Sequence, residues 1–101
     1  MAEIQLAPGI FDDFERILNH LAHFDVNDAT RIDGILSAID ILRHSPEIGR
    51  LLGAGSRELI IGRGARGFIA LYRFVPILDT VFVLAIRNQR ELGYKHGDTK
   101  I

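Results

Sequence analysis

The chain has 101 residues, a formal net charge of −1 and no cysteine, and 48% of its residues are hydrophobic and 25% charged. This length and composition predict one globular domain over residues 1–101 with its own core. The lack of cysteine excludes disulfides, cysteine-ligated zinc sites and thiol catalysis. No apolar stretch approaches the roughly 18 residues of a membrane span and the amino terminus does not resemble a signal peptide, so we expect a cytoplasmic protein without a membrane partner.

The first elements along the chain are a short strand and an amphipathic helix. Residues 3–7 alternate apolar and polar side chains, which is typical of a strand, and Pro8 then occupies a position suited to a first helical turn. The helix is indicated by one apolar stripe: Ile10, Phe14, Ile17, Leu18 and Leu21. Its early acids, Asp12, Asp13 and Glu15, are explained by the helix dipole rather than by a catalytic pair.

A second helix follows a break at residues 24–28, which contains good N-cap residues. Its apolar stripe consists of Ile32, Ile35, Leu36, Ile39 and Leu42. The helix should end near Ser45, because the residue before a proline resists helical geometry. The short connection between the two helices predicts an antiparallel helical hairpin.

The second half of the chain predicts strands. Residues 46–56 form a glycine-rich link, which lacks the lysine and spacing of a phosphate-binding loop. Strand patterns then cover residues 57–61, 68–75 and 80–86, with turns at 62–67 and 76–79, which indicates an antiparallel meander. Residues 95–101 are expected to be a flexible tail. The predicted fold is therefore α+β, a helical hairpin packed on a mostly antiparallel three- to four-stranded sheet in the order β-α-α-β-β-β.

The last predicted strand ends in charged residues at one rim of the sheet. Its unbroken apolar run, residues 81–86, indicates a strand buried on both faces and therefore placed centrally. Arg87 and Arg90 follow where the strand leaves the core, close in sequence to Tyr94. On the preceding strand, Arg73 shares a face with odd-numbered residues, and a buried unpaired charge is costly. We therefore expect the helices to cover the even-numbered face, or Arg73 to lie at an exposed strand end.

Charge is distributed unevenly along the chain. Residues 1–30 carry six acidic residues and one basic residue, whereas residues 57–101 carry eight basic and four acidic residues. Ten of the twelve basic residues are arginine, whose planar fork suits carboxylates and phosphates.

The histidines do not indicate a metal site, because His20 and His23 lack an evident third ligand. We predict no metal and no cofactor.

Several passages together resemble the RelE/ParE superfamily of toxins from type II toxin–antitoxin systems, in particular the ParE-like plasmid-stabilisation branch. The resemblance covers roughly residues 4–94. It is carried by residues 14–17, by the run 39–50 with its Pro-x-x-Gly-Arg passage, by residues 57–59, by Tyr72-Arg73, and by the last strand with its Arg-Asn-Gln-Arg-Glu ending at residues 87–91. Many relatives place a histidine where this chain has Asn88.

The resemblance implies a toxin that a cognate antitoxin neutralises. ParE-like members inhibit DNA gyrase and need a docking surface, whereas RelE-like members cut messenger RNA on the ribosome and need cationic and proton-transferring groups. The net charge of −1 and the scarcity of lysine favour gyrase inhibition. The alternatives are the ribosome-dependent endonuclease, with Arg57, Arg87, Arg90 and Tyr94 as its residues, and a non-toxic binding module. Residues proposed to bind the target or the antitoxin are Arg57, Arg66, Tyr72, Arg73, Arg87, Arg90 and Tyr94.

Overall fold

The computed structural model describes residues 1–22, 28–62, 67–91 and 93–94, without the side chains of residues 20–22 and 28–31. Its elements are β1 (Glu3–Leu6), α1 (Gly9–Ala22), α2 (Asp28–Asp40), η1 (Ile41–Arg43), β2 (Arg50–Leu51), η2 (Gly53–Gly55), β3 (Ser56–Ile61), β4 (Phe68–Val75), η4 (Pro76–Leu78) and β5 (Thr80–Asn88). The predicted tail at 95–101, most of the predicted break at 24–28, and Arg66 with most of its turn lie outside the described residues, as do the side chains of His20 and Leu21.

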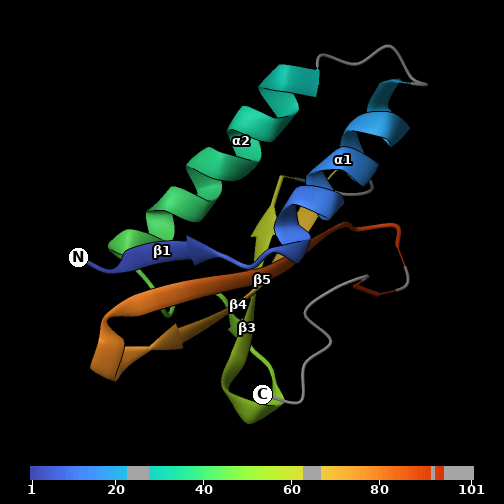
Figure 1. The fold of residues 1–101 in the computed structure, drawn as a ribbon. Helices are drawn as coiled ribbons and strands as arrows, with labels where there is room; N and C mark the ends of the chain where they lie inside the picture. Colours follow the sequence, from blue (N-terminus) through green and yellow to red (C-terminus); the bar gives the residue numbers. More distant parts are fainter. Residues whose placement is uncertain (23–27, 63–66, 92, 95–101) are drawn as a thin grey trace.

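The predicted α+β architecture is confirmed. The sheet has the strand order β1-β5-β4-β3-β2, with β1 parallel to β5 and the other neighbours antiparallel. Both helices lie on one side of it as an antiparallel pair (Figure 1). Within the described residues, no helix is long and apolar enough to cross a membrane.

The sheet contains one strand more than the sequence pattern predicted. β2 consists of Arg50 and Leu51 alone, inside the glycine-rich link, and it pairs with Glu58 and Arg57 of β3. Two residues are too few to show the alternation that identifies a strand. β2 is therefore stabilised by its pairing with β3 rather than by a local sequence pattern. This pairing places Arg50 beside Glu58.

The main hydrophobic core lies between the helices and the sheet. It includes Ile10 and Ile17 of α1, Ile35 and Ile39 of α2, and side chains from the sheet: Ile61, Phe68, Ala70, Tyr72, Val81, Val83 and Ile86. The even-numbered face of β4 is thus the covered one, as expected from Arg73. One helical position differs from prediction, because Leu36 is 40% exposed.

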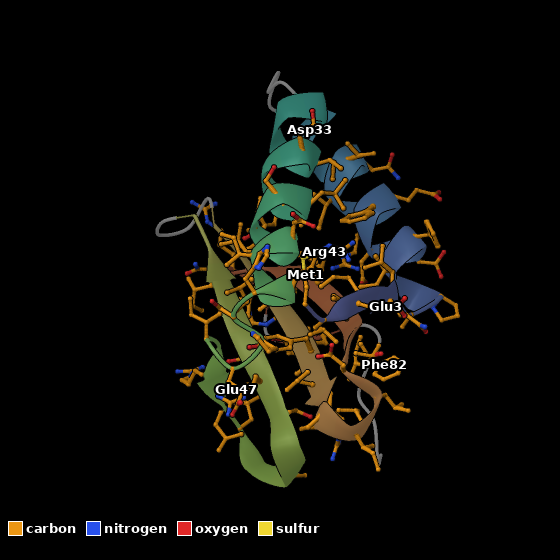
Figure 2. The ribbon with its side chains drawn as sticks, turned by 90° about the vertical axis from the view of Figure 1, so that its left-hand side faces the viewer. Met1, Glu3, Asp33, Arg43, Glu47 and Phe82 are labelled. Atoms are coloured by element: carbon orange, nitrogen blue, oxygen red, sulfur yellow. The ribbon has the colours of Figure 1, made fainter. Side chains whose placement is uncertain are left out.

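The amino terminus is attached to the end of the helical layer. The Ala2 N–H donates a hydrogen bond of 2.8 Å to the Arg43 carbonyl, and Figure 2 shows Met1 beside Arg43. The Glu3 N–H donates to the Asp79 carbonyl at 2.9 Å. These bonds hold β1 between η1 and the turn that precedes β5.

A β-bulge in β5 decides which face its last side chains occupy. Leu71 pairs with Ala85 whereas Tyr72 pairs with Val83, so Leu84 is an extra residue in β5. Before the bulge, Val81 and Val83 belong to the main core, and after it Ile86 does. Strand alternation then turns Arg87 to the face that the helices leave open, an example of a bulge redirecting a side chain.

Candidate functional site

Four side chains meet on the open face of the sheet, and we call them the open-face cluster: Arg50, Glu58, Arg87 and Tyr94. Glu58 pairs across the ladder with Leu71, which belongs to the small apolar group on this face. Arg50 is the partner of Glu58 on β2. The fold therefore brings two residues from β2 and β3 together with two from the end of β5 and the segment after it, which lie much later in the sequence.

Glu58 lies at the centre of the open-face cluster. The residue is only 6% exposed. One carboxylate oxygen accepts a hydrogen bond from the Tyr94 hydroxyl at 2.6 Å, and the other accepts one from Arg50 Nη2. Burial raises the pKa of Glu58, but these hydrogen bonds and the charges of Arg50 and Arg87 outweigh it and bring the pKa below its ordinary value. The carboxylate is thus held ionised among positive groups.

Tyr94 and Arg87 complete the cluster. The Arg87 guanidinium lies 5.1 Å from the centroid of the Tyr94 ring, within the range of a cation–π contact. Arg87 Nη1 donates to the Glu91 carbonyl at 2.8 Å. Burial, together with the hydrogen bond to Glu58 and its charge, raises the pKa of Tyr94 strongly. The phenol therefore acts as a hydrogen-bond donor and keeps its proton far above neutral pH.

Two of the predicted contact residues, Arg57 and Tyr72, lie on the opposite face. Tyr72 is fully buried in the main core, and its hydroxyl accepts a hydrogen bond from the Gly49 N–H at 2.8 Å. Arg57 pairs with Tyr72 across the ladder and donates to the carbonyls of Glu47 and Gly49 at 3.0 and 2.9 Å. Both residues hold the loop that leads into β2, so they support the position of Arg50 from behind the sheet.

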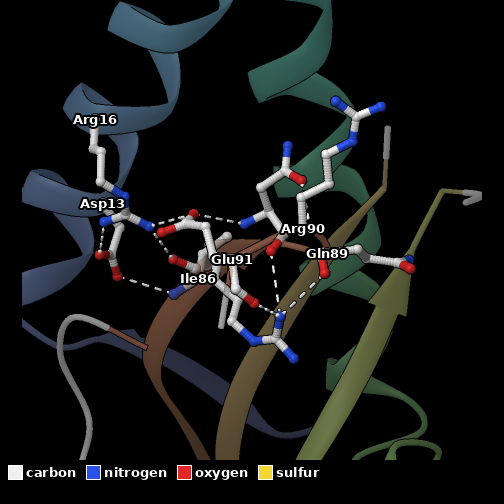
Figure 3. A network of polar contacts seen from close by, with 8 residues as sticks. Asp13, Arg16, Ile86, Gln89, Arg90 and Glu91 are labelled. Carbon is white, nitrogen blue, oxygen red and sulfur yellow. Dashed lines mark hydrogen bonds and ion pairs between the residues drawn. The ribbon is translucent and has the colours of Figure 1, made fainter. Parts of the chain in front are cut away.

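Arg73 and Arg90 lie apart from the open-face cluster. Arg73 is half-buried on the open face, close to Gly55, which has a positive φ of 84°. Arg90 is exposed, and its side chain extends away from the neighbouring polar network (Figure 3). Arg66 lies outside the described residues. Of the four residues suggested for a nuclease, the structure brings Arg87 and Tyr94 into contact, whereas Arg57 lies on the opposite face and Arg90 is exposed.

A second polar group joins α1 to the end of β5, and we call it the edge cap: Asp13, Arg16 and Glu91 (Figure 3). β1 ends at Leu6, whose partner is Val83, so the later backbone groups of β5 lack a strand on that side. Asp13 accepts the Ile86 N–H at 2.9 Å and Arg16 donates to the Ile86 carbonyl at 3.1 Å. Glu91 accepts the Asn88 N–H at 2.9 Å. Side chains thus replace the missing strand.

The edge cap corrects the interpretation of Asp13. The sequence assigned Asp13 to the helix dipole, but it is fully buried on the same face of α1 as Ile10 and Ile17. Arg16 binds its carboxylate at 2.7 Å. Asp13 is structural, as predicted, although the reason is tertiary: it anchors β5 and, through Arg16 and Glu91, the segment that carries Tyr94.

Sequence reasoning missed Glu58 and Arg50 as members of the site. One signal for Glu58 was available, because it lies between Arg57 and Leu59 in a predicted strand and must face opposite to them. Arg50 gave no such signal, since its strand has two residues. The bulge that turns Arg87 toward Glu58 is also invisible in the sequence pattern.

The lowered pKa of Glu58 predicts an acid-sensitive contribution to stability. The ordinary value is 4.5 and the folded value lies below it, so folding favours the ionised carboxylate. This contribution is fully present above pH 4.5 and is lost as the pH falls through the folded pKa. We expect the difference in unfolding free energy between the wild type and Glu58→Gln, measured by urea denaturation, to shrink as the pH drops below 4.5. A difference that stays constant with pH would contradict this assignment.

Known proteins resemble this chain in sequence. The sequence matches the family described as ParE toxin of type II toxin–antitoxin system, parDE, over residues 4–93. It is also 32% identical over 92 residues to Toxin RelE3 of Caulobacter vibrioides, an alignment that spans 90% of this chain and 98% of that protein. The chain therefore belongs to the ParE toxin family of type II toxin–antitoxin systems, within the RelE/ParE superfamily.

Proposed function

We propose that this toxin acts by inhibiting DNA gyrase and that it docks through the open face of its sheet. The observation that carries the proposal is the position of Glu58. Glu58, which is 6% exposed, lies between Arg50, Arg87 and Tyr94, so these two arginines already have a negative partner. Such a surface suits a protein partner better than the scissile phosphate of an RNA, which a fixed carboxylate repels.

The groups available for proton transfer also favour inhibition. Cleavage of a phosphodiester requires a base and an acid positioned at the reacting atoms. The raised pKa of Tyr94 makes its phenolate inaccessible near neutral pH, and its hydroxyl donates to Glu58. Asn88 stands where many relatives carry histidine, and its side-chain oxygen accepts the Arg90 N–H at 2.9 Å. Asn88 therefore supports a turn and offers no group that titrates.

The second candidate is a ribosome-dependent messenger RNA endonuclease. It is favoured by the relative named Toxin RelE3 and by the contact between Arg87 and Tyr94 on the open face. The non-toxic binding module is the third alternative, and normal growth after induction without antitoxin would favour it.

Purified toxin and DNA gyrase test the proposal directly. We expect the toxin to inhibit supercoiling of relaxed plasmid and to increase cleaved DNA. Arg50→Ala should weaken this inhibition because the exposed Arg50 side chain lies on the docking face, whereas Arg43→Ala, on the helical side, should not. Unchanged gyrase activity at a large excess of toxin, together with new cuts in translated messages detected by primer extension, would replace this proposal with the endonuclease.

Membership of the family implies a cognate antitoxin. We propose that its toxin-binding segment is acidic, because the last 45 residues of the toxin carry eight basic and four acidic residues. The simplest check is the neighbouring reading frame, which should encode a small protein whose segment for toxin binding is rich in aspartate and glutamate.

A further inference from the structure

We propose that Glu58 is a specificity-determining residue, an internal counter-ion that keeps single-stranded nucleic acid from binding to Arg50 and Arg87 on the open face. This inference rests on the proposed function. In it, Glu58 is the residue that makes the open face suited to a protein partner rather than to RNA.

The geometry of the carboxylate supports this role. Both oxygens of Glu58 are used, one by Arg50 and the other by Tyr94. Arginine and tyrosine side chains donate hydrogen bonds to the phosphate oxygens of nucleic acids. Glu58 therefore occupies the place that a phosphate oxygen would take between them.

The exposure of Arg50 means that, without Glu58, a phosphate from solvent could bind on this face. The Arg50 side chain is 69% exposed, while the Glu58 side chain is 7% exposed. A phosphate could reach the Arg50 guanidinium from solvent, but it would meet the carboxylate behind it. Because the carboxylate is held by the sheet through β3, it cannot move away as a flexible surface side chain would.

Arg87 has hydrogen-bonding capacity that its neighbours leave unused. Its Nε atom is buried and has no hydrogen-bond partner among the described residues. A buried donor without a partner is uncommon and calls for an explanation. Arg87 is held by Tyr94 and by the Glu91 carbonyl, and the charge of Glu58 acts on it. Neutralising Glu58 would leave two arginines on this face without their shared counter-charge.

Binding of a short fluorescein-labelled oligouridylate, followed by anisotropy at low salt, tests the inference. We expect weak binding by the wild type and at least about tenfold tighter binding by Glu58→Gln, the size of one gained charge-assisted contact. The slope of log K against log salt should steepen by about 0.7 for each phosphate contacted. In the Glu58→Gln background, Arg50→Ala should remove most of the gain.

The matched control is Asp40→Asn. Asp40 is an exposed carboxylate paired with Arg43 at 2.6 Å on the helical side, so its replacement changes the net charge equally. We expect this variant to bind the oligonucleotide like the wild type. An equal gain in oligonucleotide affinity for Glu58→Gln and Asp40→Asn would overturn the inference, because the gain would then come from the change in net charge alone.

A further measurement does not depend on the folding of Glu58→Gln. Arg50→Ala alone should change oligonucleotide binding less than about twofold, because Glu58 already occupies its guanidinium. A severalfold loss for this variant would overturn the inference, as would tight binding by the wild type. Failure of the gyrase proposal is recognised separately, because it appears in the supercoiling assay, in which no oligonucleotide is present.

Discussion

Replacing Asp13 by alanine is expected to lower the free energy of unfolding by about 2–4 kcal/mol, because one partner of a partly buried ion pair and the acceptor of a buried N–H are both removed. Asp13 is fully buried and accepts both the Ile86 N–H and a hydrogen bond from Arg16. Without it, a buried N–H of β5 loses its acceptor. Since folded domains are stable by only about 5–15 kcal/mol, the loss is a large share of the total. Urea denaturation followed by circular dichroism measures it.

Two further variants of α1 sharpen this test. Asp13→Asn retains an oxygen for the Ile86 N–H and should lose less stability than Asp13→Ala. Glu15→Gln, an exposed position on the same helix, should change stability by less than about 0.5 kcal/mol. The edge-cap interpretation would be wrong if Asp13→Ala and Glu15→Gln were equally stable.

Gly49→Ala is expected to destabilise the protein by about 2–4 kcal/mol, because a methyl group has no space there. A Cβ at this position would lie 2.6 Å from the Tyr72 ring and hydroxyl and 2.8 Å from the Glu58 carbonyl oxygen. The ring is fully buried and the carbonyl belongs to β3, so neither can shift easily. The Gly49 N–H would also lose its alignment with the Tyr72 hydroxyl. Thermal or urea denaturation provides the measurement.

Gly53→Ala is the control for this prediction, because a Cβ at Gly53 would meet nothing within 4 Å. It should leave stability nearly unchanged. Tyr72→Phe removes the hydroxyl that both accepts the Gly49 N–H and crowds the new methyl group. The double variant Gly49→Ala/Tyr72→Phe should therefore lose less unfolding free energy than the sum of the two single variants, since the two substitutions act on the same contact. Strict additivity would argue against the described contact.

The close approach at Gly49 gives a physical reason for the Pro-x-x-Gly-Arg passage of the sequence. Glycine allows the loop to rest on Tyr72, and Arg57 holds the same loop through the Glu47 and Gly49 carbonyls. The next residue, Arg50, then enters β2 opposite Glu58. A packing requirement on the covered face thus positions a charged residue on the open face.

Local patterns predicted the helices and four of the five strands, because apolar periodicity shows which side of an element is buried. From Arg73 they predicted either that the helices cover the even-numbered face of β4 or that Arg73 lies at an exposed strand end, and the first alternative is the one observed. They identified Asp13 as structural but did not give the reason, because a buried carboxylate on an apolar stripe needs hydrogen-bond partners that the stripe itself does not reveal. Here the partners are the Ile86 N–H and Arg16.

The sequence by itself determined the α+β class, the helical hairpin, the buried last strand and the family, since these depend on composition, periodicity and motifs in order. Only the tertiary structure decided which charged residues meet. The bulge at Leu84 turns Arg87 to the open face, the short β2 brings Arg50 to Glu58, and the edge cap fixes the segment before Tyr94. Each depends on a partner in another element of the fold, such as the Ile86 N–H for Asp13 or Glu58 for Arg50, and so leaves no periodic signal within its own segment.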